Sequence, residues 1–385
     1  MTDAFFTLDT GEPMGSLPAD TGQYSDMISA HMVEFSRLAY AGQSEVAAQL
    51  KARGFVKLSF FRSDATFGWL AEHPGSASRK PFSVVAFRGT ERYYADIVTD
   101  LSVFKRPIAD SKYRVHGGFL TALNVVWGSQ HSPAGDDTFK ITHYGSKGLI
   151  HALMQTTYEA DIYFTGHSMG GALADLAAYK LQLQLDSLIK AGTEVSGITA
   201  LYSYGAPRTM GRKLAKSLDD RQPFQYYRVM NGADLVPRTP IMGFQHWGES
   251  ITLRHNGERV KNMPIINAFF LIWLKQLLVF VVLFALIQLG MEKVEDLKLY
   301  SDMFGRTTQE PWLSNVVGVV VCLVMYGVVF IFAPKLIALL PGDMSRWWGN
   351  KLVSDHLSKN YRKKLMVLAQ TTPDPQVKSE PVIET

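Results

Sequence analysis

The sequence predicts an α/β fold in which helices cover both faces of a mainly parallel sheet. Apolar segments with the character of strands, such as 82–89 and 198–205, alternate with segments whose apolar residues recur at helical spacing, such as 146–158. This alternation is typical of parallel strands joined by crossover helices. The stretch "DIYFTGHSMGGALADLA" at 161–177 gives the clearest unit, a short apolar strand that turns directly into an Ala-rich helix.

Several segments precede this unit in the chain. Residues 1–22 are rich in Gly, Pro, Asp and Thr and are expected to form a flexible leader. Residues 23–42 carry apolar side chains at helical intervals and predict an amphipathic helix that ends at Gly42. "FVKLSFF" and "TFGWLAE" predict short paired strands, and "FSVVAFRG" predicts a buried strand that ends at Gly89. A helical pattern follows at 117–127.

Further strands and helices follow the unit at 161–177. A helix is predicted from Met169 to about Leu185, followed by a strand over "ITALYSYG" and a strand over "YYRVM" that runs into Asn231. The α/β domain is therefore expected to occupy residues 23–262.

Composition and charge exclude several classes of protein. With 47% hydrophobic and 12% aromatic residues among 385, the chain can form a packed core. Its formal net charge of +4 is too small for this length to indicate a nucleic-acid partner. The single cysteine, Cys322, permits neither an intrachain disulfide nor a cysteine-based zinc site. No metal, nucleotide or redox motif and no export signal is recognised, so we expect no cofactor and no cleaved leader.

Two long apolar runs follow the α/β domain. Residues 265–289 are interrupted by Lys275 and a few amides, and residues 313–333 contain no charged residue. Because a helix of roughly 20 residues crosses the hydrocarbon core of a bilayer, these runs predict a two-helix transmembrane hairpin over 263–341. Two buried core helices, or a hairpin that lies in the membrane interface, are the alternatives.

Charged residues predict the orientation of this hairpin. The linker at 291–312 is net acidic, whereas both outer flanks are rich in Lys and Arg. By the positive-inside rule the flanks, and with them the α/β domain and both termini, are expected in the cytoplasm. A return helix is predicted over 342–370, followed by a disordered, Pro- and charge-rich tail over 371–385.

The tight turn after the strand at 161–166 indicates a nucleophile. "GHSMG" places Ser168 between Gly166 and Gly170, where the strand becomes a helix. A G-x-S-x-G corner strains the serine backbone and exposes its hydroxyl above the sheet. The N–H groups that begin the helix favour the negative charge that develops during attack on an ester. This context predicts an α/β-hydrolase fold with Ser168 as the nucleophile.

A serine nucleophile needs a base to take its proton and an acid to orient that base. In α/β-hydrolases the order along the chain is Ser, then Asp or Glu, then His. Asp234 lies just past a predicted strand, in a turn closed by Pro237, and is the candidate acid. His246 and His356 both follow it, and both are candidates for the base.

These motifs resemble a known family. "FRGT", "GHSMGGALA", "YSYGAPR" and "RVMNGADLVPRTP", in this order, look like the motifs of the class 3 lipases, the fungal-type triacylglycerol and diacylglycerol lipases. The resemblance covers roughly residues 30–250 and the segment near His356. It implies Ser168 as nucleophile and Asp234 as acid. It favours His356 as base, because "DHLSKNY" is similar to the family's late His…Tyr segment, and it makes His246 structural.

The resemblance also implies an oxyanion hole. It points to Thr90 in "FRGT", with a second N–H from Met169, and removing one such donor typically costs about 3 kcal/mol of transition-state stabilisation. Residues 91–104 would correspond to the mobile lid of the family, with a plain surface helix as the alternative. The inserted hairpin departs from the family pattern. His116 is interpreted as a structural histidine.

The sequence therefore predicts a membrane-tethered serine lipase or esterase. Its expected partners are the bilayer and a lipid substrate, an acylglycerol or a phospholipid, whose acyl ester it hydrolyses through an acyl-enzyme. A catalytically inactive membrane scaffold is the first alternative, if His356 cannot reach Ser168. A lipase-type antibacterial toxin is the second.

Overall fold

The computed structural model describes most of the α/β domain and one late helix. The described residues are 17–63, 66–77, 79–90, 104–109, 111–128, 140–143, 148–156, 160–195, 197–232, 234, 236–240, 243–254, 258–261 and 356–371. All of them belong to one compact unit of the chain, formed by residues 1–263 and 351–385. The predicted spans at 265–289 and 313–333, and residues 91–103 of the predicted lid, lie outside the described residues.

A mixed sheet forms the centre of this unit. In the described residues its strand order is β13 (Arg259–Lys261), β12 (Glu249–Leu253), β10 (Gln225–Asn231), β8 (Ala200–Tyr204), β7 (Asp161–His167), β3 (Phe82–Phe87), β2 (Phe67–His73), β1 (Lys57–Arg62) and β6 (Lys140–His143). The run from β3 through β7, β8 and β10 to β12 is parallel throughout. The β1–β2–β3 pairs and the β12–β13 pair are antiparallel. The prediction of a mainly parallel sheet is confirmed.

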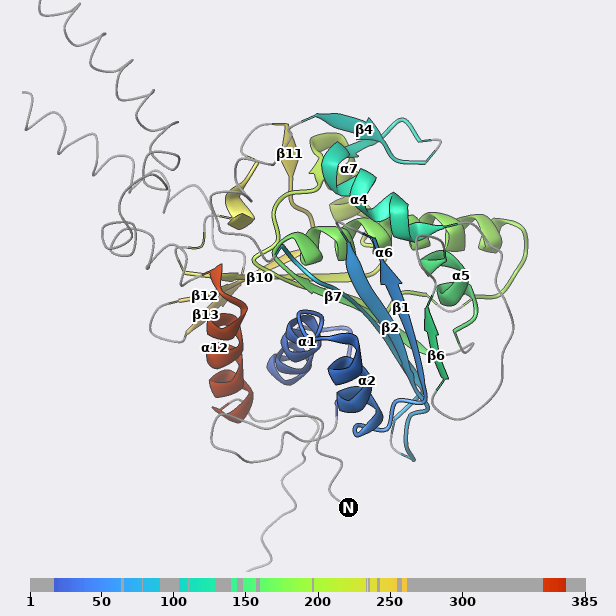
Figure 1. Ribbon diagram of the computed structural model, residues 1–385. Helices are drawn as coiled ribbons and strands as arrows, with labels where there is room; N and C mark the ends of the chain where they lie inside the picture. The colour runs from blue at the N-terminus through green and yellow to red at the C-terminus, as the bar shows by residue number, and fades with distance from the viewer. Residues whose placement is uncertain are drawn as a thin grey trace, which may run out of the picture. The chain divides into compact units, whose positions relative to one another are not determined.

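Helices cover both faces of this sheet (Figure 1). One face carries α1 (Asp26–Leu38), α2 (Gln43–Lys51) and α12 (Ser358–Thr371), and the other carries α4 (Gly117–Trp127), α5 (Leu149–Met154), α6 (Met169–Lys190) and α7 (Arg212–Arg221). Strand β7 shows how the core divides between the faces. Ile162 and Phe164 pack among residues of α4 to α7, whereas Tyr163 between them packs on the face of α1. Because helices cover both faces of the sheet, every residue of β7 after Asp161 is buried.

Several elements differ from the sequence-based expectation. The first helix ends at Leu38 rather than at Gly42, and α2 follows it as a separate helix that the pattern did not predict. A second, four-stranded sheet was also not predicted; its order is β11 (Phe244–Gln245), β9 (Met210–Gly211), β5 (Arg114–His116) and β4 (Lys105–Pro107). Strands this short carry too few residues to show a period of two, so tertiary pairing decides where they form.

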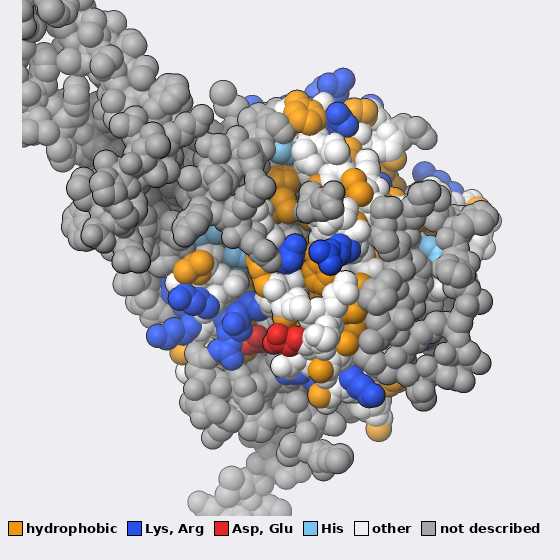
Figure 2. Space-filling model, viewed as in Figure 1, with side chains coloured by type: hydrophobic (Ala, Val, Ile, Leu, Met, Phe, Trp, Pro, Cys, Tyr) orange, Lys and Arg blue, Asp and Glu red, His pale blue; other side chains and the backbone are white. Residues whose placement is uncertain are grey.

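Helix α12 returns to the sheet from late in the chain. Tyr361, Leu365, Met366 and Ala369 follow one another at helical spacing and are buried, and α12 packs beside α1. Full burial of a side chain such as Leu365 contributes about 2 kcal/mol. Lysine and arginine side chains gather over the region of α12 and β13 (Figure 2). Ion pairs such as Arg362 with Glu34 tie this region to α1.

The structure does not support the predicted membrane hairpin. Among the described helices α6 is the longest, with 22 residues, but it carries the charged residues Asp175, Lys180, Asp186 and Lys190. In the part of the chain that the structure describes, no helix combines the length and the apolarity that crossing a bilayer requires. This finding contradicts the predicted localisation as a two-span membrane protein with both termini in the cytoplasm. The hydropathy of a segment measures its transfer free energy, and this alone does not show that the segment spans a membrane.

The strand order and the turn from β7 into α6 define the domain. The parallel strands, the helices on both faces and the serine at the strand-to-helix corner together form an α/β-hydrolase fold.

Candidate active site

Ser168 lies at the corner between β7 and α6. Its backbone has φ 57° and ψ −130°, a conformation that side-chain-bearing residues rarely adopt. The turn also brings Gly170 against strand β3, where an added Cβ would lie 2.2 Å from the Phe87 carbonyl oxygen. A side chain at this position would push the corner away from the sheet. The glycine therefore permits the tight turn that carries the serine.

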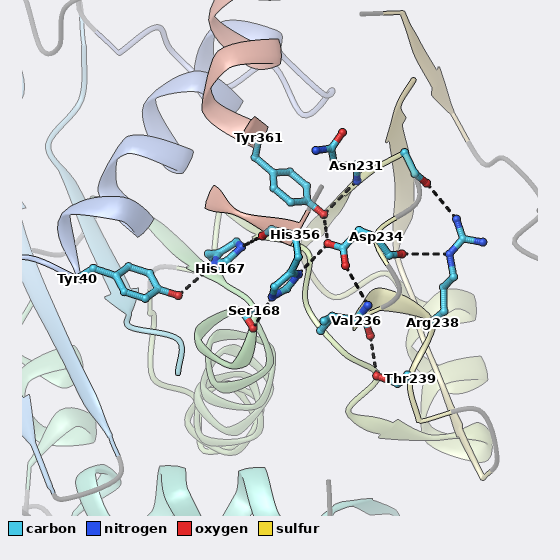
Figure 3. Close-up of polar contacts among 11 residues, drawn as sticks. Tyr40, His167, Ser168, Asn231, Asp234, Val236, Arg238, Thr239, His356 and Tyr361 are labelled. Atoms are coloured by element: carbon cyan, nitrogen blue, oxygen red, sulfur yellow. Dashed lines mark hydrogen bonds and ion pairs between the residues drawn. The ribbon is translucent and has the colours of Figure 1, made fainter. Parts of the chain in front are cut away.

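Ser168, His356 and Asp234 lie in one hydrogen-bonded chain (Figure 3). The His356 Nε2 atom is 2.9 Å from the Ser168 hydroxyl oxygen, and its Nδ1 atom is 2.9 Å from Asp234 Oδ2. An ionised carboxylate only accepts, so Nδ1–H donates to Asp234, and Nε2 accepts from the Ser168 hydroxyl. All three residues are buried, with Ser168 1%, Asp234 2% and His356 6% exposed.

Further hydrogen bonds hold the Asp234 carboxylate. The Val236 N–H donates to Oδ1 at 2.9 Å, and the Tyr361 hydroxyl donates to Oδ2 at 2.6 Å. The Tyr361 oxygen in turn accepts from the Asn231 N–H at 3.0 Å. Tyr361 is a site residue that reasoning from residue types alone missed. Its one signal in the sequence is the late His…Tyr segment on which the resemblance depends.

His246 has a different partner. Its Nε2 atom lies 2.6 Å from the Pro237 carbonyl oxygen, to which it donates. Burial, with the nearby Arg228 guanidinium, holds the pKa of His246 well below its usual range. The structure therefore places this candidate base on a backbone carbonyl of the turn after Asp234.

Thr90 and Met169 lie beside each other next to Ser168. Thr90 follows the end of β3, and its hydroxyl lies 3.5 Å from the Met169 sulfur. Met169 begins α6, and the N–H groups of a first helical turn have no acceptor within the helix. The two residues proposed for an oxyanion hole thus come from neighbouring elements. In the described ranges, no group of His, Cys, Asp and Glu side chains is arranged to hold a metal ion.

Comparison with known proteins finds a similarity in the central part of the chain. Residues 84–244 match the model of a family described as lipase (class 3). Over this segment, which is less than half of the chain, the protein is similar to the class 3 lipases. The matched segment contains Thr90, Ser168 and Asp234, whereas His356 lies beyond its end.

Curated relatives of this segment are also lipases. A secreted mono- and diacylglycerol lipase of Malassezia restricta is 37% identical over 84 residues, which are 21% of this chain and 25% of that protein. Phospholipase A1-II 1 of Oryza sativa subsp. indica is 26% identical over 179 residues, 44% of this chain and 42% of that protein. This chain thus spans less than half the length of both relatives. The Malassezia relative is a secreted protein by name, unlike the cytoplasmic membrane protein that hydropathy predicted for this chain.

Among solved structures, the native Rhizomucor miehei lipase propeptide complex has a TM-score of 0.46 and 20% sequence identity, covering 68% of this chain and 84% of that one. The family match and the lipase relatives support a carboxylic ester hydrolase.

Several buried groups of this domain couple its stability to pH. Burial lowers the pKa of His167 to about 3 and that of His116 to about 4, and it holds the pKa of His246 well below its usual range. Burial acts in the opposite sense on Asp175, whose pKa it raises to about 6. The His116 Nδ1 atom accepts from the Phe119 N–H at 3.4 Å, which requires an unprotonated nitrogen. His116 is therefore a structural histidine in this fold.

We expect the free energy of unfolding to fall as the pH falls from about 6.5 toward 4. In this window the unfolded chain protonates the three histidines while the native chain does not, so acid favours unfolding. Asp175 has the opposite sign, because its native carboxyl keeps a proton up to about pH 6, and it offsets one of the three. Each proton that the unfolded chain binds in excess of the native chain changes the free energy of unfolding by about 1.4 kcal/mol per pH unit. Urea unfolding between pH 4.5 and 7.5 measures this slope, and a pH-independent midpoint would contradict the prediction. His116→Phe should make the slope shallower.

Proposed function

We propose that this protein is a serine-type carboxylic ester hydrolase that acts on acyl esters of lipids. The observation that carries the proposal is the hydrogen-bonded chain from Ser168 through His356 to Asp234 at a strained strand-to-helix corner. A hydroxyl, an imidazole and a carboxylate in this order form the arrangement that activates a serine for acyl transfer. The match of residues 84–244 to the class 3 lipases supports the same chemistry.

In the proposed mechanism, the Ser168 oxygen attacks the ester carbonyl while His356 Nε2 takes the hydroxyl proton. Asp234 accepts from His356 Nδ1–H, which keeps the other nitrogen free as a base and stabilises the imidazolium that forms. The backbone N–H groups of Thr90 and Met169 donate to the oxygen that becomes negative, and each such donor is worth about 3 kcal/mol in the transition state.

The tetrahedral intermediate then collapses. The bond to the leaving alkoxide breaks, His356 returns the proton to that oxygen, and the alcohol leaves an acyl group on Ser168. Water repeats the attack with His356 again as the base, which releases the fatty acid and restores the serine. No cofactor takes part in these steps.

For the substrate we propose a fatty acyl ester of a glycerolipid. The names of the relatives describe mono- and diacylglycerol lipase, phospholipase A1 and, in Ricinus communis, triacylglycerol lipase. The bond common to acylglycerols and phospholipids is a carboxylic ester between a fatty acid and glycerol. An inactive scaffold, the first of the two alternatives, requires that His356 cannot reach Ser168, and the distance of 2.9 Å between their side chains favours the hydrolase.

A fluorophosphonate probe and a lipid mixture test the proposal together. We expect the probe to label Ser168, as mapped by mass spectrometry of peptides, and we expect the protein to release free fatty acid from mixed acylglycerols and phospholipids. The lipid products identify which ester is cleaved. A folded protein that neither reacts with the probe nor releases fatty acid would favour the scaffold.

A further inference from the structure

Two successive residues of the β7–α6 turn contact the same histidine. Ser168 bonds the ring of His356, and the preceding residue, His167, lies with its Nε2 atom 2.6 Å from the main-chain oxygen of His356 (Figure 3). On its other side, the His167 Nδ1 atom lies 3.0 Å from the hydroxyl of Tyr40, which comes from the loop after α1. The main chain of His356 is thus connected through one buried imidazole to a different element of the fold.

The directions of these two hydrogen bonds follow from the chemistry of the groups. A carbonyl oxygen only accepts, so His167 carries its proton on Nε2 and donates to His356. In a neutral imidazole with its proton on Nε2, the Nδ1 atom can only accept, so the Tyr40 hydroxyl donates to it. His167 is 5% exposed, and burial together with the neighbouring His356 lowers its pKa to about 3. The ring therefore stays neutral at the pH values at which a histidine base works.

The chain leaves space for Tyr40 to reach this ring. Gly89 lies beside the Tyr40 hydroxyl, and a Cβ added at Gly89 would lie 2.2 Å from that oxygen and 2.6 Å from the His167 carbonyl oxygen. The hydroxyl therefore occupies room that any side chain at position 89 would take. The next residue, Thr90, belongs to the proposed oxyanion hole, so the Tyr40 hydroxyl lies between that loop and the turn of Ser168.

We propose that Tyr40 and His167 are positioning residues that hold the main chain of His356, so that its ring meets both Ser168 and Asp234. The inference rests on the proposed function and deepens it. Asp234 fixes one edge of the imidazole, but a ring on a displaced main chain would no longer point its Nε2 atom at the serine. A displacement of about 1 Å in a reacting group can cost on the order of 10²-fold in rate. The hydrogen bond from His167 to the His356 carbonyl oxygen prevents this displacement of the main chain.

Kinetics of four variants of the full chain test the proposal on a soluble short-chain ester. Tyr40→Phe removes only the hydroxyl, and we expect kcat to fall roughly fivefold to tenfold with KM unchanged. His167→Leu removes both hydrogen bonds, with an expected fall in kcat of about 100-fold. His167→Gln should recover part of this loss, because its amide N–H can still donate to the His356 carbonyl. His31→Leu is the matched control: His31 is a fully buried histidine of α1 whose Nδ1 atom bonds the Met27 carbonyl, away from the triad. It should lower the thermal midpoint and leave kcat unchanged.

A spectroscopic measurement accompanies the kinetics and needs no turnover. The proton between His356 Nδ1 and Asp234 gives a low-field proton resonance, which we expect to shift in Tyr40→Phe and His167→Gln and to stay in place in His31→Leu.

Wild-type kcat and an unshifted resonance in folded His167→Leu and Tyr40→Phe would overturn the proposal. If His167→Leu does not fold, Tyr40→Phe decides. If the wild type shows no hydrolysis that depends on Ser168, the proposed function fails; hydrolysis that the Tyr40 and His167 variants retain in full refutes only the positioning role.

Discussion

Ser168→Ala is expected to lower kcat for ester hydrolysis by on the order of 10⁶-fold, the size of the loss when the nucleophile of a serine hydrolase is removed. Alanine leaves His356 and Asp234 in place but offers no oxygen to attack the carbonyl. Water would then have to act in a site shaped for a covalent intermediate. The residual rate should reflect the oxyanion donors and substrate binding alone.

The measurement compares initial rates on a short-chain ester and on the lipid that the product analysis identifies. Ser36→Ala is the matched control, since Ser36 is also buried but bonds the Val33 carbonyl at 2.8 Å on α1. It should keep the kcat of the wild type. Equal rates for Ser168→Ala and the wild type would remove Ser168 from the mechanism, and loss of folded protein in circular dichroism would show that the rate is not a test of chemistry.

His356→Gln is expected to produce a loss similar to that of Ser168→Ala, again on the order of 10⁶-fold in kcat. Glutamine keeps polar atoms near Ser168 and Asp234, but its amide nitrogen cannot take a proton from the serine hydroxyl. When two residues act together in one step, removing either of them already loses most of the rate enhancement that they provide together. The double variant with Ser168→Ala and His356→Gln should therefore have a kcat only a little lower than that of either single variant.

His246→Gln is the matched comparison for the base. Its amide N–H can still donate to the Pro237 carbonyl, so the turn after Asp234 should keep its shape and kcat should stay within a few-fold of the wild type. The reverse result, a large loss for His246→Gln and a small one for His356→Gln, would assign the base to His246.

The candidate nucleophile and the candidate acid could be located from the sequence because each position depends on local features. A strand, a G-x-S-x-G corner and a small-residue helix occur within a few consecutive residues around Ser168, and the strained turn is a property of that short segment. Asp234 follows β10 directly, at the end of a parallel strand where α/β proteins carry their site residues. For both residues, the neighbouring sequence contains the features that place the side chain at the end of a strand.

The base could not be chosen from residue types alone. His246 and His356 both follow Asp234 along the chain, and their spacing carries no information about which ring reaches Ser168. The resemblance favoured His356, and the structure has its ring between Ser168 and Asp234 while His246 bonds a backbone carbonyl. The same holds for His167 and Tyr40, because residues from separate parts of the chain meet only in the folded state.

The spacing of apolar residues predicted the main strands and helices, since an element of several residues reveals its buried face through its own spacing. The G-x-S-x-G motif predicted the strand-to-helix corner at Ser168. Three features became visible only in the folded protein: which histidine meets Ser168, which tyrosine holds Asp234 and where the short strands of the second sheet pair. These contacts join residues far apart in the chain, and their free energy arises from burial and hydrogen bonds that no local pattern records.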